Sequence, residues 1–252
     1  MNFNIHKELG SGFLPAKPRA NLRDIWNAFM VKDATFSDND IPFCPTYLPN
    51  GLPKKLIAYN DAKEIYSKMI KNGNTVFYED AFIHFYIDDY WFDKPSDSIW
   101  LYPNKALEII KHFAGIITAD FSTYVDFPKP LILYNTYRMR AFGYWIFKQG
   151  IPVINNVRWG FEDSWDYCFD GIESNSIVCI GTVASGIKEV AYRPLFENGL
   201  FQLIECKKPH TILVYGSSNY EVFRLLENKG IKIISFPSKT NEAFRKGGPY
   251  HV

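Results

Sequence analysis

From residue 56 onward, the chain alternates short apolar runs with stretches in which apolar positions recur at helical spacing. The runs are rich in β-branched and aromatic residues, which is typical of buried strands. About eight strands are expected, at 56–59, 75–78 with 81–87 (one kinked strand or two), 116–119, 131–134, 152–154, 177–180, 211–215 and 231–236. Helices are expected over 61–73, 104–115, 137–148, 164–172, 193–207 and 219–230.

Strands that alternate with helices of this length predict βαβ units and a mainly parallel sheet, hence an α/β fold. Eight such units favour a compact (β/α)8, TIM-type barrel. The alternative is an open, doubly wound parallel sheet. Residues 1–55 contain several prolines and no clean period, apart from a helix expected around residues 22–31. We therefore interpret 1–55 as an N-terminal arm or cap and 56–252 as the barrel-like domain, because the arm is too short to build a core alone.

The composition is that of a folded globular protein, with 47% hydrophobic and 22% charged residues. The best apolar run, 141–147, is too short for a membrane helix, and the start of the chain lacks the apolar segment of a secretory signal. A cytoplasmic protein that does not bind membranes is expected. The formal net charge is +1, so no basic field is present to bind nucleic acid non-specifically.

The familiar chemical motifs are missing. The four cysteines form no C-x-x-C pair, so no metal site is predicted. Gly181 and Gly186 have the spacing of a phosphate-binding P-loop, but Ile187 stands between the second glycine and Lys188. These glycines could still form a turn whose backbone approaches a phosphate closely, without a P-loop. No cofactor is therefore expected, although an acidic side chain of this chain could bind Mg²⁺.

In either parallel architecture, ligands bind at the carboxyl ends of the strands, and polar groups follow nearly every predicted strand. Asp89 and Asp120 are the candidate catalytic residues, because a carboxylate there could act as general base or nucleophile. Arg138 and Arg158 could hold a phosphate through paired hydrogen bonds. The other candidate substrate-binding residues are Asn135, Tyr137, Asn156, Trp159, Gly181, Tyr215 and Ser217. Equally, the charged residues could form a structural ion-pair network that caps the barrel.

Six phrases along the chain carry a resemblance to a known family: HFYIDDY (84–90), GIITADFSTY (115–124), ILYNTYRMRAFGYW (132–145), IPVINNVRWG (151–160), DYCFDGI (166–172) and VYGS (214–217). In this order, the chain resembles a family of bacterial proteins that carry a domain of unknown function and are common in phages and integrated mobile elements. More loosely, a strand that ends in aspartate, a strand that ends in Trp-Gly and then an IGT strand follow one another in an order that is similar to tRNA-guanine transglycosylase-like barrels. That likeness implies base exchange or cleavage at an N-glycosidic bond by an aspartate, but the zinc cysteines of those enzymes are absent here.

Two functions follow. The first is an enzyme that acts on a nucleotide or nucleic-acid base, with an aspartate as acid, base or nucleophile and arginines on the phosphate. Trp159 or Tyr137 would then stack on the base. The second is a non-catalytic protein of a phage or mobile element that binds a host or phage macromolecule, as a replication accessory or an inhibitor of host defence. The residues alone do not decide whether the protein is an enzyme.

Overall fold

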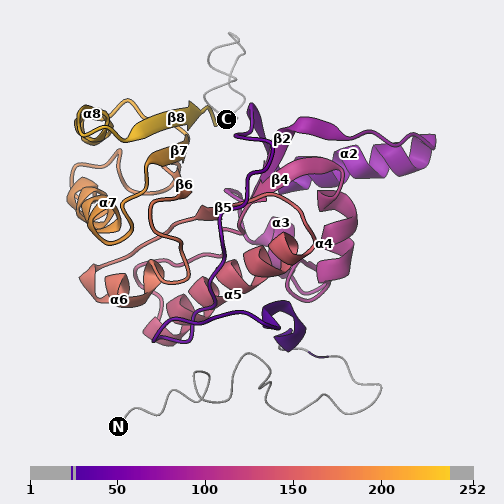
Figure 1. The fold of residues 1–252 in the computed structure, drawn as a ribbon, viewed down its shortest axis with the longest axis horizontal. Helices are drawn as coiled ribbons and strands as arrows, with labels where there is room; N and C mark the ends of the chain where they lie inside the picture. The colour runs from indigo at the N-terminus through magenta and orange to yellow at the C-terminus, as the bar shows by residue number, and fades with distance from the viewer. Residues whose placement is uncertain (1–23, 25–26, 239–252) are drawn as a thin grey trace.

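The computed structural model describes residue 24 and residues 27–238. Seven strands form a single sheet, and all of its neighbouring strands are parallel. In sheet order they are β1 (Lys55–Ala58), β2 (Tyr78–His84), β4 (Phe113–Ile117), β5 (Val153–Asn156), β6 (Ile177–Gly181), β7 (Thr211–Tyr215) and β8 (Lys232–Phe236). The sheet curls into a half-barrel with helices outside it (Figure 1).

The helices cover the outer face in two groups (Figure 1). Those of the first half accompany β1 to β4, α5 runs along the middle of the sheet, and those of the second half accompany β6 to β8. They are η1 (Ala28–Val31), α2 (Tyr59–Asn72), α3 (Tyr90–Asp93), α4 (Pro103–Ile110), α5 (Lys129–Lys148), η2 (Glu162–Ser164), α6 (Trp165–Cys168), α7 (Arg193–Lys207) and α8 (Glu221–Asn228). The short strand β3 (Asp97–Ser98) pairs with residues 93–94 outside the sheet.

Both predicted architectures need correction. Strand neighbours follow chain order, as in a barrel, but no pairing between β1 and β8 closes the sheet within the described residues. The order never reverses, whereas a doubly wound sheet has a reversal at its switch point. The α/β class and the parallel sheet are confirmed, and the closed eight-stranded barrel is not.

The missing strand is 131–134, which belongs to α5. Pro130 stands in the first turn of this helix, where its fixed φ and missing N–H are tolerated. Within the run, Ile132 is buried while Leu131 and Tyr134 are well exposed, so one helix face is buried. A short apolar run does not distinguish a strand from a helix segment, and for this reason a strand was predicted at 131–134.

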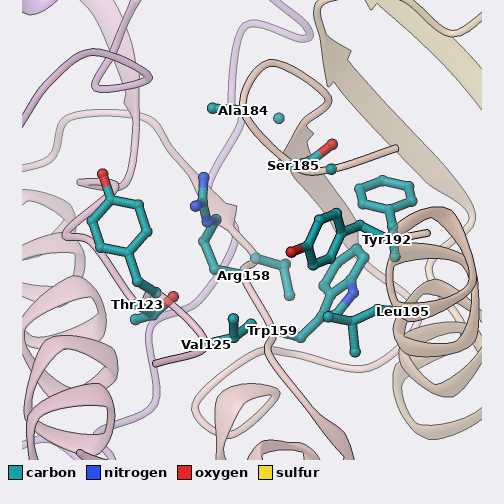
Figure 2. Close-up of a pocket in the computed structure, with 13 residues that line it drawn as sticks. Thr123, Val125, Arg158, Trp159, Ala184, Ser185, Tyr192 and Leu195 are labelled. Carbon is teal, nitrogen blue, oxygen red and sulfur yellow. The ribbon is translucent and has the colours of Figure 1, made fainter. Parts of the chain in front are cut away.

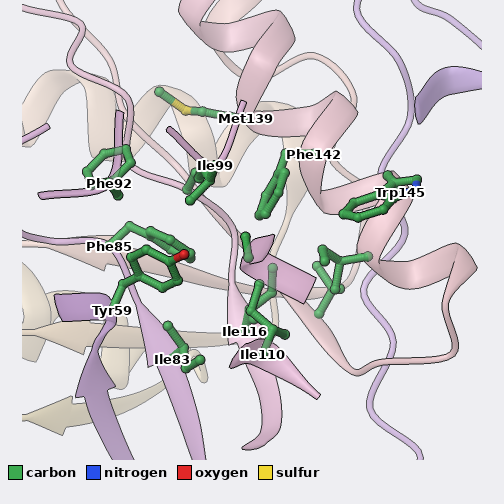
Figure 3. Packing of buried hydrophobic residues seen from close by; sticks show 14 of the residues in the cluster. Tyr59, Ile83, Phe85, Phe92, Ile99, Ile110, Ile116, Met139, Phe142 and Trp145 are labelled. Carbon is green, nitrogen blue, oxygen red and sulfur yellow. The ribbon is translucent and has the colours of Figure 1, made fainter. Parts of the chain in front are cut away.

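Side chains alternate between the two faces of the curled sheet. One residue or more from each strand points inward and forms the filling of the half-barrel: Leu56, Phe82, Ile117, Ile154, Cys179, Leu213 and Phe236. Their neighbours point outward to two helix-covered clusters. In the first cluster, rings from α2, α5 and the loops pack closely, with Tyr59 and Phe85 stacked at 5.0 Å between centroids (Figure 3).

A segment before β1 inserts beside β5, on the side that faces β6. Tyr47 exchanges two backbone hydrogen bonds with Val153, each 3.0 Å, and Thr46 Oγ1 donates to the Ile177 carbonyl at 3.2 Å. This insertion keeps β5 and β6 apart at their starts. The proposed domain boundary at residue 55 stays a prediction. Of the expected helix at 22–31, Ala28–Val31 is a 3-10 turn, and 22, 23, 25 and 26 lie outside the described residues.

Arg140 of α5 is completely buried and ties the helix to the loops at the site. Its guanidinium donates to three main-chain carbonyls, those of Asn156 at 2.9 Å, Asp170 at 3.0 Å and Cys168 at 3.4 Å. A buried cation is tolerated only when its donors find acceptors, and here carbonyl oxygens provide them. Arg140 thereby holds the end of β5 and the segment after α6 against α5.

Candidate functional site

An ion pair lies at the carboxyl ends of β4 and β5. Arg158 Nη1 donates to Asp120 Oδ2 at 3.1 Å, and Asn156 Nδ2 donates to Asp120 Oδ1 at 2.7 Å. Asp120 is 8% exposed, and this burial raises the pKa of its carboxyl group, while Arg158 and Asn156 oppose the rise. Both carboxylate oxygens are thus occupied, and Asp120 fixes the position of the Arg158 guanidinium.

Tyr86, which follows β2, supports this pair from inside the half-barrel. Its hydroxyl donates to Asn156 Oδ1 at 2.9 Å, which orients the amide toward Asp120. The Tyr86 ring stacks on Tyr215 with centroids 5.0 Å apart, and lies against Gly181, where an added Cβ would come within 2.9 Å of the ring. Gly181 and Tyr215 were predicted to bind substrate. Both contact Tyr86, a residue that the sequence did not single out, and Gly181 also lines the cavity described below.

Asp89 belongs to a neighbouring cluster on the loops after β2 and β4. It accepts hydrogen bonds from Ser122, at 3.1 Å from the backbone N–H and 2.8 Å from the hydroxyl. Burial raises its pKa, the bonds from Ser122 oppose this, and Asp93 adds to the rise. Arg138 Nη1 donates to Asp93 at 2.6 Å, and Nη2 donates to Asn135 at 2.7 Å. The guanidinium of Arg138 is therefore occupied within the protein.

Two further candidates lie apart from the pair. Tyr137 lies on α5 with its ring beside that of Trp100, with centroids 6.3 Å apart, because the strand expected before it, at 131–134, belongs to the same helix. Ser217 accepts a bond from Thr182 Oγ1 through its carbonyl at 2.9 Å, and this bond joins the loops after β6 and β7. Neither residue is among those that line the cavity described next.

A cavity of about 180 Å³ opens beside Arg158, between the loops after β4, β5 and β6 and the start of α7 (Figure 2). Its wall is largely aromatic and apolar, and Arg158 is the one charged side chain among the described residues that line it. They are Thr123, Tyr124, Val125, Val157, Arg158, Trp159, Gly181, Ala184, Ser185, Gly186, Tyr192, Leu195 and Phe196. In Figure 2, Arg158 lies between Thr123 on one side and Tyr192 and Trp159 on the other.

Trp159 is held in the wall by a close approach to α7. A Cβ added at Gly199 would lie 2.1 Å from Cδ1 and 2.2 Å from Nε1 of the indole, so only glycine leaves room for the ring. Phe196 packs on it with a centroid distance of 5.1 Å, and Phe169 at 6.2 Å. The ring is thus fixed at the cavity.

Several hydrogen-bonding groups at the cavity have no partner within the described part of the chain. Arg158 uses Nη1 on Asp120, and neither Nε nor Nη2 makes a hydrogen bond there. The backbone N–H groups of Ala184, Ser185 and Gly186 are likewise unbonded. Ala184 has φ 55°, a left-handed conformation that a residue with a Cβ rarely adopts. Thr123 Oγ1 is buried and unbonded as well.

These groups share a chemical preference. Successive N–H groups in a turn with left-handed residues form a concave site that attracts anions, and a guanidinium fork matches phosphate or carboxylate. Between residues 27 and 238, no three His, Cys, Asp or Glu side chains are placed to hold a metal ion, so Mg²⁺ binding stays an expectation. In the same part of the chain, no helix is long and apolar enough to cross a bilayer.

The sequence model of the Domain of unknown function (DUF4417) family matches residues 40–237, and the chain belongs to this family. The "Gene 1 protein" of Mycobacterium phage L5 is 36% identical over 183 residues, which are 72% of this chain and 74% of the phage protein. The "Gene 1 protein" of Mycobacterium phage D29 is 33% identical over 138 residues, 55% of this chain and 49% of that protein. The chain thus spans about half the length of the D29 relative.

The expected membership in a phage-borne family of unknown function is confirmed. No solved structure matches the chain. The looser likeness to tRNA-guanine transglycosylase-like barrels therefore stays a prediction.

Proposed function

We propose that this member of a phage-borne family binds a nucleotide in the cavity beside Arg158. The observation that carries the proposal is that a single charged side chain, with unused hydrogen-bond donors, faces a cavity lined by aromatic rings. Phosphate would bind the free edge of the guanidinium and the N–H groups of Ala184 to Gly186. Charge-assisted hydrogen bonds of this kind are among the stronger ones in proteins.

The planar part of the ligand is matched by the rings of Trp159 and Tyr192. Aromatic stacking contributes about 1–3 kcal/mol per base and depends little on which base is present. A dry apolar cavity of about 150 Å³ accommodates benzene, so the 180 Å³ found here suits one ring system. The position at the carboxyl ends of parallel strands agrees with where such sheets place their ligands.

In this proposal Asp120 orients Arg158. The raised pKa of its carboxyl group is what a general acid or base near neutral pH requires. Asn156 and Arg158 each donate to one of its oxygens, so a role as acid, base or nucleophile requires the nucleotide to reach a remaining lone pair of this buried carboxylate. We therefore propose nucleotide binding first, and a chemical step by Asp120 only in addition to it.

The test is a thermal-shift screen of the purified protein against nucleotides, nucleosides, sugar phosphates and divalent metal ions. A ligand at 100 times its dissociation constant adds about 2.7 kcal/mol to stability, which raises the Tm of a chain of this size by several degrees. We expect nucleotides to give dose-dependent shifts, and Arg158→Lys to remove them. Arg138→Lys is the matched control, because Arg138 is occupied by Asp93 and Asn135. The proposal would be refuted if no ligand of the panel raises the Tm, or if nucleotides raise the Tm equally in wild type and Arg158→Lys.

One observation favours a second candidate, the binding of a host or phage macromolecule. Apolar side chains at the cavity mouth and on the adjoining loop are exposed: Tyr124 is 54% exposed, Tyr192 52% and Val190 82%. Exposed clusters of this kind are common in interaction surfaces. Under this alternative no nucleotide raises the Tm. The wild-type protein captures a phage or host protein, and Val190→Asp does not capture it.

A further inference from the structure

The cavity beside Arg158 has no surplus of formal charge. Arg158 is the one charged side chain among the described residues that line it, and Asp120 balances its positive charge across a distance of 3.1 Å. The rest of the wall is largely aromatic and apolar, and the backbone N–H groups of Ala184 to Gly186 carry no formal charge. The site therefore offers hydrogen-bond donors to an anion without an unbalanced cation.

The loops around the cavity supply no surplus of positive charge either. Lys188 and Arg193 are basic, but the same loops carry four acidic residues, Asp126, Glu162, Asp163 and Glu189. In addition, Arg193 Nε already donates to the Ile187 carbonyl at 3.1 Å. The loops therefore do not favour a second or third phosphate group beside the first, as in a nucleoside triphosphate.

The charge of a phosphate depends on how many of its oxygens are esterified. A phosphomonoester carries a charge of about −1.5 to −2 at pH 7, whereas a phosphodiester has one ionisable oxygen and a single negative charge. The free energy lost when an anion leaves water for an apolar site rises steeply with its charge, and only nearby positive charge offsets it. Because Asp120 already balances Arg158, this cavity favours the singly charged diester.

A phosphodiester has a second substituent, and the surroundings of Arg158 offer a place for it. Trp159 and Tyr192 lie on one side of Arg158, and Thr123 lies on the other (Figure 2). Tyr124, which follows Thr123 in the chain, also lines the cavity and is 54% exposed. A ligand with its phosphate on Arg158 thus has an aromatic surface for a base in two directions.

We propose that the phosphate on Arg158 is a phosphodiester that joins two nucleosides, so that the protein binds a dinucleotide unit in preference to a free nucleoside monophosphate. The inference rests on the proposed nucleotide binding and names the class of nucleotide. The first base lies against Trp159 and Tyr192, and the second base lies on Tyr124. Since the surrounding loops are acidic, the further phosphates of a longer strand add no affinity.

The experiment compares ligands that share one nucleoside and differ in their phosphate. Dissociation constants are measured calorimetrically for a nucleoside 5′-monophosphate, the methyl ester of its phosphate, and the dinucleoside monophosphate that contains the same 5′-phosphate. We expect the methyl ester to bind about fivefold more tightly than the monophosphate, which is the size of an exposed charge interaction. The dinucleoside monophosphate should bind about fivefold more tightly again, which is the lower end of base stacking. A tetranucleotide that contains the same unit should bind within about twofold of it, because one phosphate is held.

Two variants test the two parts of the proposal separately. In Asp120→Asn the balancing charge is lost, so the monophosphate should gain affinity relative to the methyl ester and the preference should disappear. In Tyr124→Leu the dinucleoside monophosphate should lose its advantage over the methyl ester. Tyr90→Leu is the matched control, because Tyr90 is 60% exposed and does not line the cavity, and it should keep this advantage.

The results separate this inference from the proposed function. If wild type binds the monophosphate as tightly as the methyl ester, or if Asp120→Asn keeps the full preference, the argument from charge is overturned while nucleotide binding stands. Equal binding of the methyl ester and the dinucleoside monophosphate would overturn the second base on Tyr124. A much tighter tetranucleotide would overturn the limit to one phosphate. If no nucleotide binds at all, the proposed function fails and this inference fails with it.

Discussion

Gly199→Ala is the substitution whose effect follows most directly from the geometry of the site. In a helix interior, alanine is favoured over glycine by about 1 kcal/mol. Here the new Cβ would lie 2.1 Å and 2.2 Å from two ring atoms of Trp159, whereas carbon atoms in contact stay about 3.5–4.0 Å apart. The ring has to move by more than 1 Å or the helix has to shift.

The magnitude follows from two opposing effects. Overpacking a core costs about 1–3 kcal/mol, and an overlap this deep belongs at the upper end of that range. Phe196 and Phe169 limit the movement of the indole, so the strain is not relieved cheaply. After subtraction of the helix-propensity gain, we expect a net loss of about 2 kcal/mol. At about 2–4 °C per kcal/mol, this lowers Tm by about 4–8 °C.

The assay is urea unfolding followed by fluorescence and far-UV circular dichroism. Glu205→Ala, an exposed substitution in the same helix, should stay within about 0.5 kcal/mol of wild type. The double variant Gly199→Ala/Trp159→Phe should be less destabilised than the sum of its single variants, because the smaller ring leaves room. If Gly199→Ala is as stable as wild type, Gly199 does not hold the indole of Trp159 in the cavity wall.

Three further predictions concern the groups around the site. Arg140→Met should destabilise the protein by about 3–5 kcal/mol in urea unfolding, because it leaves three buried carbonyls without donors; a loss below 1 kcal/mol would contradict this. Burial raises the pKa of Asp120 in the folded protein, so the stability of wild type relative to Asp120→Asn should be greatest below about pH 4 and fall as pH rises through the folded pKa. If the stability of wild type relative to Asp120→Asn increases over that pH range, folding lowers the pKa of Asp120 and does not raise it. In the native protein a maleimide should label Cys206 rapidly and leave Cys44 and Cys179 unmodified, since burial raises the pKa of each of these two thiols to about 12; mass spectrometry of the labelled protein checks this.

The regular elements of the second half could be predicted from the sequence because their signals are local. The long helix was expected at 193–207 and lies there, and the strands at 177–180 and 211–215 are confirmed to within one residue. Continuous buried runs between turn residues make such strands distinct. The prediction of a strand at 131–134 is wrong because the local pattern suits a strand as well as the first turns of α5.

The site was only partly predictable, for a physical reason. The rule that strand ends carry the site led to Asp120, Asn156 and Arg158, which the fold brings together. Tyr86 was missed because its role depends on a glycine in β6, a strand far away in the sequence. Tyr192 was missed because nothing local shows that the start of α7 approaches the loop after β5.

Phosphate binding by Arg158 can be measured by a calorimetric titration of one nucleotide and its parent nucleoside into wild type and Arg158→Lys. In wild type the phosphate should improve binding at least tenfold, as expected for hydrogen bonds from a guanidinium. In Arg158→Lys this advantage should fall to a few-fold or less, with nucleoside binding unchanged. An equal phosphate advantage in both proteins would show that Arg158 does not bind the phosphate.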